Sequence, residues 1–332
     1  MKRITNLKSS VRFISRASIG GYEEMNGPLG ESFDLTDTGD LFGMDTFELA
    51  EAEMGRRALN AALAKANLSH ESISLLVAGD LQNQCVASSV GLSSFGIPFL
   101  GVYGACSTCT ESLMILSSFM ESSENITYGA AVTTSHNSAA ERQFRTPVEY
   151  GAQRAKSAQW TSTAGGAFIL GREGGSSKIS SFMAGRIVDG TVKDGSNMGA
   201  AMSFAAADSI LSYFEESGES PKEFDYIVTG DLGAVGSSIL RDILSKELPS
   251  AAGLHTDCGL LLYDSDKKDT HSGASGCGTS AAVLSNHFLP LFEDKKIEKI
   301  LFLSTGALMS KSSLLQGENI YGIAPLIKIE AV

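Results

Sequence analysis

Few cysteines and the lack of a secretory signal set the first limits on this chain. Its 332 residues include 5 cysteines, and an odd number does not favour a framework of disulfides. The chain does not open on a basic segment followed by an apolar run and a small-residue cleavage site, which is the pattern of an exported protein. We therefore expect free thiols and a reducing, cytoplasmic compartment.

Basic residues are also scarce. Lysine and arginine number 26 against 38 aspartates and glutamates, and the formal net charge of −12 argues against a nucleic-acid partner, because phosphate binding needs clustered cations. The N-terminus is the exception, since five basic residues precede the first acidic one, Glu23: Lys2, Arg3, Lys8, Arg12 and Arg16. This arm could lie against anionic lipid. We favour the alternative, a solvated terminus that leads into a strand at residues 11–15.

Long apolar runs and several familiar catalytic signatures are missing too. Residues 81–110 carry no charge, but amides, glycines and Pro98 interrupt them, so they predict buried elements and not a membrane span. No phosphate loop, dinucleotide fingerprint, zinc-protease helix or Gly-x-Ser-x-Gly elbow occurs. We therefore expect neither a transmembrane segment nor one of these common enzyme classes.

What the sequence does contain is an alternation of helical and strand patterns. Apolar residues recur at helical spacing in 45–67, 107–121, 202–216, 236–246 and 279–292. Short apolar runs of strand length occupy 73–78, 97–103, 126–134, 164–170, 178–188, 226–229, 297–304 and 321–329. Strands that alternate with helices predict an α/β protein with a mostly parallel, helix-covered sheet.

Two pairs of similar segments, in the same order, indicate an internal duplication. The sequence LLVAGDL at 75–81 resembles YIVTGDL at 226–232, and GACST at 104–108 resembles SGCGT at 275–279. Each member of the second pair places a cysteine, Cys106 or Cys277, at the start of a predicted helix. We therefore expect two similar halves, 1–175 and 176–332, with an insertion in the second half near 249–270.

Cys106 is the first candidate for chemistry. A helix start offers unpaired N–H groups and the positive end of the helix dipole, which favour a thiolate and lower the thiol pKa. The alternative is a small buried apolar residue, a common role of cysteine. Cys106 and Cys109 also form a C-x-x-C pattern, but Cys258 and Cys277 lack the close spacing of further zinc ligands. We expect no metal site.

A second candidate group follows the strand predicted at 126–134. His136, Asn137, Arg142 and Arg145 leave that strand within ten residues, and ligands of open α/β sheets gather at the carboxyl ends of strands. Arginine suits carboxylates, because its fork can bind both oxygens. The alternative pairs the two arginines with nearby glutamates as structural salt bridges. His255, in the predicted insertion, has the sequence context of a loop or turn histidine more than of a site residue.

The order of the elements and the position of Cys106 resemble the thiolase and ketoacyl-synthase superfamily. A closer resemblance is to the stage V sporulation protein AD family. The segments that carry it are 27–30, 79–84, 104–108, 135–151, 229–232 and 257–261. The resemblance implies a duplicated, five-layer αβαβα fold with two pseudo-equivalent halves and mixed sheets.

The family resemblance also implies a function. Members are non-membrane proteins of spore-forming bacteria that bind dipicolinate (pyridine-2,6-dicarboxylate) and support its uptake into the developing spore. They act beside membrane proteins of the same uptake system, which implies a peripheral association with the forespore inner membrane. Calcium could accompany the ligand, and no other cofactor is expected. A homodimer could also form.

The sequence departs from a condensing enzyme at two positions. Ketoacyl synthases carry a histidine and an asparagine where this chain has Asp231 and Gly278, and condensation needs such donors to stabilise developing negative charge. We therefore expect a binding protein; the alternatives are an acyltransferase that forms a thioester at Cys106, or a structural subunit that docks membrane partners. The expected ligand-binding residues are Asp80, Cys106, His136, Asn137, Arg142, Arg145, Asp231, His255 and Cys277.

Overall fold

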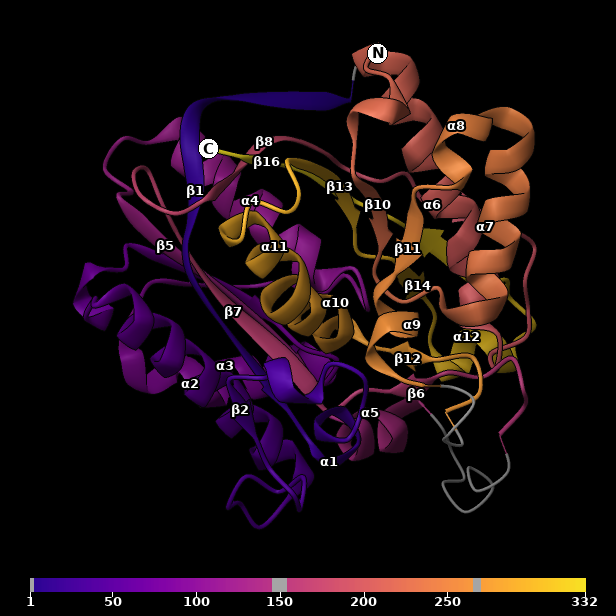
Figure 1. Ribbon diagram of the computed structural model, residues 1–332. Helices are drawn as coiled ribbons and strands as arrows, with labels where there is room; N and C mark the ends of the chain where they lie inside the picture. The colour runs from indigo at the N-terminus through magenta and orange to yellow at the C-terminus, as the bar shows by residue number, and fades with distance from the viewer. Residues whose placement is uncertain (1–2, 145–153, 265–269) are drawn as a thin grey trace.

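The computed structural model describes residues 3–144, 154–264 and 270–332, which form an 11-stranded mixed sheet with helices on both faces (Figure 1). The strands of this sheet are β1 (Ile4–Gly20), β2 (Leu35–Thr36), β3 (Leu75–Gly79), β4 (Phe99–Gly101), β5 (Tyr128–Ser135), β7 (Ala164–Gly171), β8 (Ser177–Met183), β10 (Tyr226–Thr229), β11 (His255–Asp257), β13 (Lys299–Leu303) and β16 (Leu326–Ala331). Smaller sheets are formed by β6 (Trp160–Thr161) with β12 (Ala274–Ser275), and by β9 (Val188–Asp189), β14 (Gly306–Leu308) and β15 (Tyr321–Ile323).

The same strand order occurs twice in the large sheet. From the middle outward, the first half runs β1-β7-β5-β3-β4 and the second half runs β8-β16-β13-β10-β11. Corresponding pairs have the same direction: β1–β7 and β8–β16 are antiparallel, whereas β3–β5 and β10–β13 are parallel. Antiparallel pairing of β1 with β8 joins the two sides. The repeat confirms pseudo-equivalent halves with mixed strands, and the division into units 1–175 and 176–332 stays a prediction.

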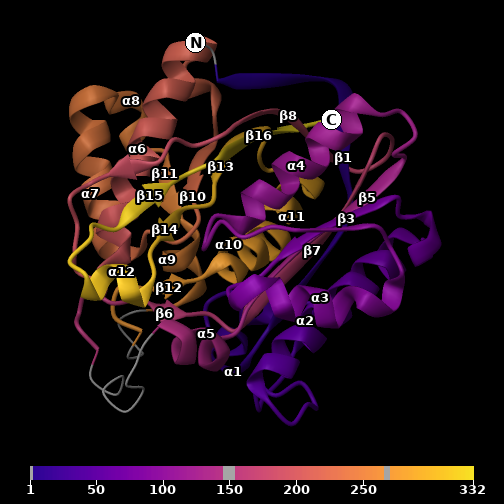
Figure 2. The ribbon, with the colours of Figure 1, turned by 180° about the vertical axis from the view of Figure 1, so that it is seen from behind.

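The helices complete a five-layer arrangement. Their bounds are α1 (Tyr22–Met25), α2 (Phe47–Ala66), α3 (Val86–Leu92), α4 (Thr108–Ser122), α5 (Asn137–Phe144), α6 (Met198–Ser217), α7 (Gly233–Glu247), α8 (Pro249–Ala252), α9 (Cys258–Leu262), α10 (Cys277–Val283), α11 (Leu289–Glu293) and α12 (Lys311–Leu315). Helices α2 and α3 cover the outer face of the first-half strands, and α6 and α7 cover that of the second half. Helices α4, α10 and α11 fill the space between the two sets of strands (Figures 1 and 2). No helix of the described residues is long and apolar enough to cross a bilayer.

Separate clusters of buried apolar side chains fill the interfaces between the layers. Leu113 and Leu116 of α4 pack with Phe288 and strand residues of both halves in the central cluster. The outer clusters form beneath α2 and α6. All seven residues of α10 are buried, whereas α4 buries the side that carries Leu113, Leu116 and Met120 and leaves Phe119 exposed. Their first residues are therefore held in the middle of the molecule.

The basic N-terminal residues have partners within the protein. Arg3 forms ion pairs of 3.2 Å with Asp208 and Glu216 of α6, and Arg16 pairs with Glu293 at 2.8 Å. Arg16 belongs to β1 and Arg3 directly precedes it, and this strand extends well beyond the predicted 11–15. The structure thus supports a terminus that leads into a strand, and it gives these two charges an internal role.

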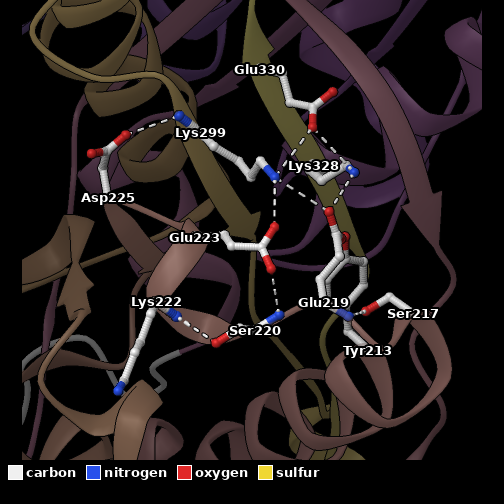
Figure 3. Close-up of polar contacts among 10 residues, drawn as sticks. All are labelled: Tyr213, Ser217, Glu219, Ser220, Lys222, Glu223, Asp225, Lys299, Lys328 and Glu330. Atoms are coloured by element: carbon white, nitrogen blue, oxygen red, sulfur yellow. Dashed lines mark hydrogen bonds and ion pairs between the residues drawn. The ribbon is translucent and has the colours of Figure 1, made fainter.

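A network of ion pairs links residues 219–223, which follow α6, to strands β13 and β16 (Figure 3). The amino group of Lys299 lies between Glu219 and Glu223, at 3.4 and 3.5 Å, and Lys328 lies 3.1 Å from Glu219. The hydroxyl of Tyr213, itself buried, donates to Glu219. Partly buried charges in such a network are screened less than isolated surface pairs. We assign this group a structural role.

The predicted insertion at 249–270 is only partly correct. Residues 255–257 form β11, which pairs with β10 as β4 pairs with β3. His255 is therefore a buried strand residue and not a loop residue, so that expectation is wrong. The stretch between β11 and α10, which contains α9, is much longer than the corresponding stretch between β4 and α4. Most of the extra length thus lies after β11.

Candidate functional site

Cys106 and Cys277 lie close to the starts of the two central helices. Cys106 precedes α4 by two residues and Cys277 is the first residue of α10, and both are buried. Their partners come from the opposite halves: Asp231, after β10, interacts with Cys106, and Asp80, after β3, lies near Cys277. The repeated Gly-Asp-Leu segments therefore supply a carboxyl group across the interface of the halves.

Asp231 is held by donors that are distant in sequence. Its carboxylate oxygens accept hydrogen bonds from the Gly276 N–H, at 2.9 Å, and from the Thr305 hydroxyl, at 2.8 Å. Burial nevertheless dominates and raises the pKa of Asp231 to about 8. The carboxyl group is therefore mostly protonated at pH 7.

The thiol of Cys106 is not activated. Burial, followed by the negative charge of Asp231, raises the pKa of Cys106 well above its ordinary value. The expectation that the helix start lowers this pKa is wrong, because removal from water and a neighbouring carboxyl group outweigh the helix dipole. His136 and His255 do not line the pocket described below, so neither takes the position of a general base for this thiol.

Close packing explains why residue 278 is a glycine. A Cβ at this position would lie 2.0 Å from the carbonyl oxygen of Ala164 and 2.6 Å from the hydroxyl of Ser135. Only glycine fits such a close approach between α10 and β7. The missing side chain at 278 is therefore not, by itself, a sign of lost catalysis. The adjacent Cys277 donates its S–H to the carbonyl oxygen of Thr134 at 3.0 Å.

A pocket with a cavity volume of about 70 Å³ reaches Cys106. Its lining residues are Leu81, Tyr103, Ala105, Cys106, Ala140, Glu141, Phe144, Thr161, Gly195, Met198, Ser275, Gly276, Ala307 and Met309. A wider hollow of about 420 Å³ shares Tyr103, Phe144 and Met309 with it and adds polar side chains, Lys311 among them. The two cavities thus adjoin, and polar side chains are more frequent in the lining of the larger one than in that of the pocket at Cys106.

Glu141 is the charged residue of the inner lining. Its Oε1 accepts a hydrogen bond from the Thr161 hydroxyl at 3.2 Å and lies 3.4 Å from Nη2 of Arg154. Arg154 stacks on Trp160, with 4.4 Å between the guanidinium carbon and the ring centre. Among the described residues, no lysine, arginine or histidine lines this pocket. Arg154 does not line it either, but it contacts Glu141, which does.

Two of the predicted donors lie away from the pocket. Arg142 is half-exposed, pairs with Glu48 at 3.2 Å and lies over the ring of Phe47. The salt-bridge alternative is therefore correct for Arg142, although its partner is Glu48 and not a glutamate of its own segment. His136 is buried, and its Nε2 bonds to the carbonyl oxygen of Asp40 at 2.7 Å. Arg145 lies outside the described residues.

The other predicted residues divide into neighbours of the pocket and structural groups. Asn137 donates to the carbonyl oxygen of Thr161 at 2.9 Å, and so fixes a residue of the pocket wall. Asp80 accepts from the Ser88 hydroxyl at 2.6 Å and so holds the first turn of α3. His255 bonds to the Thr229 hydroxyl at 2.8 Å. The structure thus brings Asp231 and Cys277 close to Cys106, which lines the pocket, and places Asp80 beside Cys277.

Sequence reasoning missed the residues that shape the pocket. Tyr103, Glu141, Arg154 and Met309 were not singled out. The signals for them are weak, although an arginine six residues before the one tryptophan of the chain is a hint of stacking. No group of three or more His, Cys, Asp or Glu side chains that could hold a metal ion occurs in the parts of the chain that the structure describes.

The fold is similar to solved structures of the thiolase-like class. The 3-oxoacyl-[acyl-carrier-protein] synthase III of Aquifex aeolicus VF5 has 15% identity and a TM-score of 0.58, over 96% of this chain and 99% of that chain. A variant of OleA from Xanthomonas campestris has 14% identity and a TM-score of 0.63, over 98% of both chains. At this identity the likeness shows the fold alone. The chain therefore has a thiolase-like fold.

Sequence comparison narrows this class to a family. The family model for stage V sporulation protein AD matches residues 1–330. The stage V sporulation protein AD of Bacillus subtilis (strain 168) is 38% identical over 310 residues, which cover 93% of this chain and 91% of that protein. The chain belongs to the stage V sporulation protein AD family.

Proposed function

We propose that this sporulation protein binds dipicolinate in the pocket at Cys106 and supports its uptake into the developing spore. The observation that carries the proposal is the pairing of Cys106 with Asp231 beside a narrow, mainly apolar pocket. A thiol kept protonated by burial, with a carboxyl group beside it, suits a binding wall better than a nucleophile. Family membership supports the link to sporulation, and we further propose that the chain acts at the forespore inner membrane beside membrane partners.

The residues that line the pocket suit a small flat ring. Tyr103 and Phe144 supply aromatic faces and Met198 and Met309 supply adaptable thioether chains, a combination that holds a planar apolar group well. The two carboxylates of the ligand need hydrogen-bond donors, and hydroxyl-bearing residues, Tyr103 and Ser275 among them, line the pocket. Calcium is proposed to accompany the ligand, because a 1:1 complex has no net charge to oppose the −12 of the protein.

Calorimetric titration tests the proposal. We expect micromolar binding of dipicolinate, weaker binding of picolinate and none of pyridine, with calcium strengthening the first. Tyr103→Ala should weaken dipicolinate binding about tenfold, because loss of an aromatic wall costs about 1.4 kcal/mol. Tyr22→Ala is the matched control, since Tyr22 is 48% exposed against 47% for Tyr103 and does not line the pocket. Absence of binding to the unmodified protein would overturn the proposal.

We also propose that the chain is not an enzyme. The raised pKa of Cys106 leaves little thiolate to attack a thioester. Incubation with acyl-CoA followed by intact-mass spectrometry should show no adduct at neutral pH. An adduct that disappears in Cys106→Ala would instead favour the acyltransferase alternative.

The edge of the sheet supports a proposed homodimer. Strand β4 is a terminal strand with all three residues exposed, and Val86, Val90, Phe99 and Leu100 are exposed apolar side chains on it and on the adjacent helix α3. An unpaired edge with an apolar border is a ready surface for pairing with a second copy. Light scattering should report twice the chain mass, and Leu100→Lys should give a monomer. A monomeric unmodified protein would rule the dimer out.

A further inference from the structure

Arg154 is a buried cation immediately behind the wall of the pocket. Its side chain is only 9% exposed, it stacks on Trp160, and one guanidinium nitrogen donates to the carbonyl oxygen of Gln159 at 3.0 Å. Stacking and a backbone bond together fix the orientation of a planar guanidinium. The guanidinium of Arg154 therefore has a fixed position beside the pocket.

The carboxylate that Arg154 faces belongs to the pocket wall. Nη2 of Arg154 lies 3.4 Å from Oε1 of Glu141, and Glu141 lines the pocket. Charge-assisted bonds of this kind are usually about 2.7–2.9 Å long and often doubled. A guanidinium has five N–H donors, and within the described residues the contacts of Arg154 to oxygen are this long one and the bond to Gln159. Arg154 therefore has hydrogen-bonding capacity left for another acceptor.

We infer that Arg154 recognises one carboxylate of the ligand, and that Glu141 competes with the ligand for the same guanidinium. The inference rests on the proposed function and adds to it the residue that selects for the charge of the ligand. Exchange of one carboxylate for another keeps the buried guanidinium of Arg154 paired before and after binding. Exchange of carboxylates on Arg154 allows this acidic protein to bind an anion although Glu141 lies in the pocket wall.

The stated roles predict opposite effects for the two residues. Arg154→Met removes the guanidinium that the ligand carboxylate would bind, so dipicolinate binding should weaken at least tenfold. Glu141→Gln removes the competitor but keeps a side chain of the same size, so binding should strengthen severalfold. Arg154→Lys keeps the charge without the fork and should give an intermediate affinity. A purely structural pair would not produce a gain in Glu141→Gln.

The experiment is calorimetry with dipicolinate and picolinate in the presence of EDTA, with melting temperatures as a check on folding. Arg172→Met is the matched control: Arg172 also donates to backbone carbonyl oxygens, those of Met120 and Ser123, but lies outside the pocket. We expect the preference for dipicolinate over picolinate to fall in Arg154→Met and to persist in Arg172→Met. If Arg154→Met does not fold, Glu141→Gln and Arg154→Lys still test the roles of Arg154 and Glu141 in binding.

The failure of this inference differs from the failure of the proposed function. If the unmodified protein binds no dipicolinate, the proposed function fails and the inference falls with it. If the unmodified protein binds dipicolinate but Glu141→Gln weakens binding, or Arg154→Lys binds as the unmodified protein does, only the role of Arg154 and Glu141 is overturned.

Discussion

The thiol of Cys106, which lines the pocket, interacts with the carboxyl group of Asp231, a residue of the opposite half of the chain. The position of Cys106 at a helix start is visible in the sequence, and so is the Gly-Asp-Leu segment that contains Asp231. Their effect on one another is not, because it depends on burial and on donors from 276 and 305. Sequence therefore predicts which residues meet here but not the protonation state that results.

The first prediction concerns the reactivity of Cys106. Iodoacetamide at pH 7.5 should modify Cys106 in the native protein at least tenfold more slowly than in the unfolded chain, because the thiolate is the reacting species and its formation is suppressed. At pH 9, above the pKa of about 8 of Asp231, Asp231→Asn removes the neighbouring negative charge and should speed the reaction severalfold. Peptide mapping by mass spectrometry reads Cys106 separately from the other four cysteines. Equal rates of the two native proteins at pH 9 would show that Asp231 does not control the thiol.

The second prediction concerns stability and pH. The pKa of Asp231 is raised from 3.8 to about 8 in the folded protein, so its stabilising contribution is fully present below the unfolded value and is lost as the pH rises toward 8. Within this window one such group lowers the free energy of unfolding by about 1.4 kcal/mol per pH unit. Urea unfolding at pH 5, 6 and 7 should show a shallower decline for Asp231→Asn than for the unmodified protein. Parallel pH profiles would contradict the assignment.

Among the elements, helices and strands with a clear apolar pattern were predictable from sequence. Strand β10 was predicted with its observed bounds, and helix α2 within two residues. The elements that escaped prediction are short: β11 has three residues, and its sequence, His-Thr-Asp, has no apolar pattern. Pairing with β10, and not local preference, makes it a strand. Of the missed pocket residues, Glu141 belongs to the short helix α5, and Tyr103, Arg154 and Met309 belong to loops.

The third prediction concerns the packing of α2 against α3. At Gly91, a Cβ would lie 2.0 Å from the carbonyl oxygen of Ala52, so Gly91→Ala should force the helices apart and cost about 1–3 kcal/mol of stability. Gly253→Ala is the matched control, because nothing lies within 4 Å of its Cβ position and its φ of −76° suits alanine. The control should be neutral or stabilising by up to about 1 kcal/mol. Chemical denaturation of both variants gives the comparison, and similar effects would show that the helices can move apart freely.

At the scale of the whole molecule, the two halves share more than a boundary. The pairing of β1 with β8 makes their strands one sheet, and the central core takes side chains from both. The crossed positions of Asp231 and Asp80 add polar contacts through the same interface. Neither half buries its inner face alone, so a duplication that is readable in sequence does not imply two independent folding units.

The last prediction follows from this shared core. We expect urea to unfold the protein in a single transition, because loss of either half exposes the apolar surface of α4 and α10. Trp160 is a suitable probe, since it belongs to β6 of the first half and pairs with Ala274 in β12 of the second. Its fluorescence should therefore report separation of the halves, and its midpoint should coincide with that of far-ultraviolet circular dichroism, which reports helices throughout the chain. Fluorescence that changes at a clearly lower urea concentration than the dichroism would show that the halves part before they unfold. The pocket, whose walls come from both halves, would then be lost in the first step, and dipicolinate should shift that step alone.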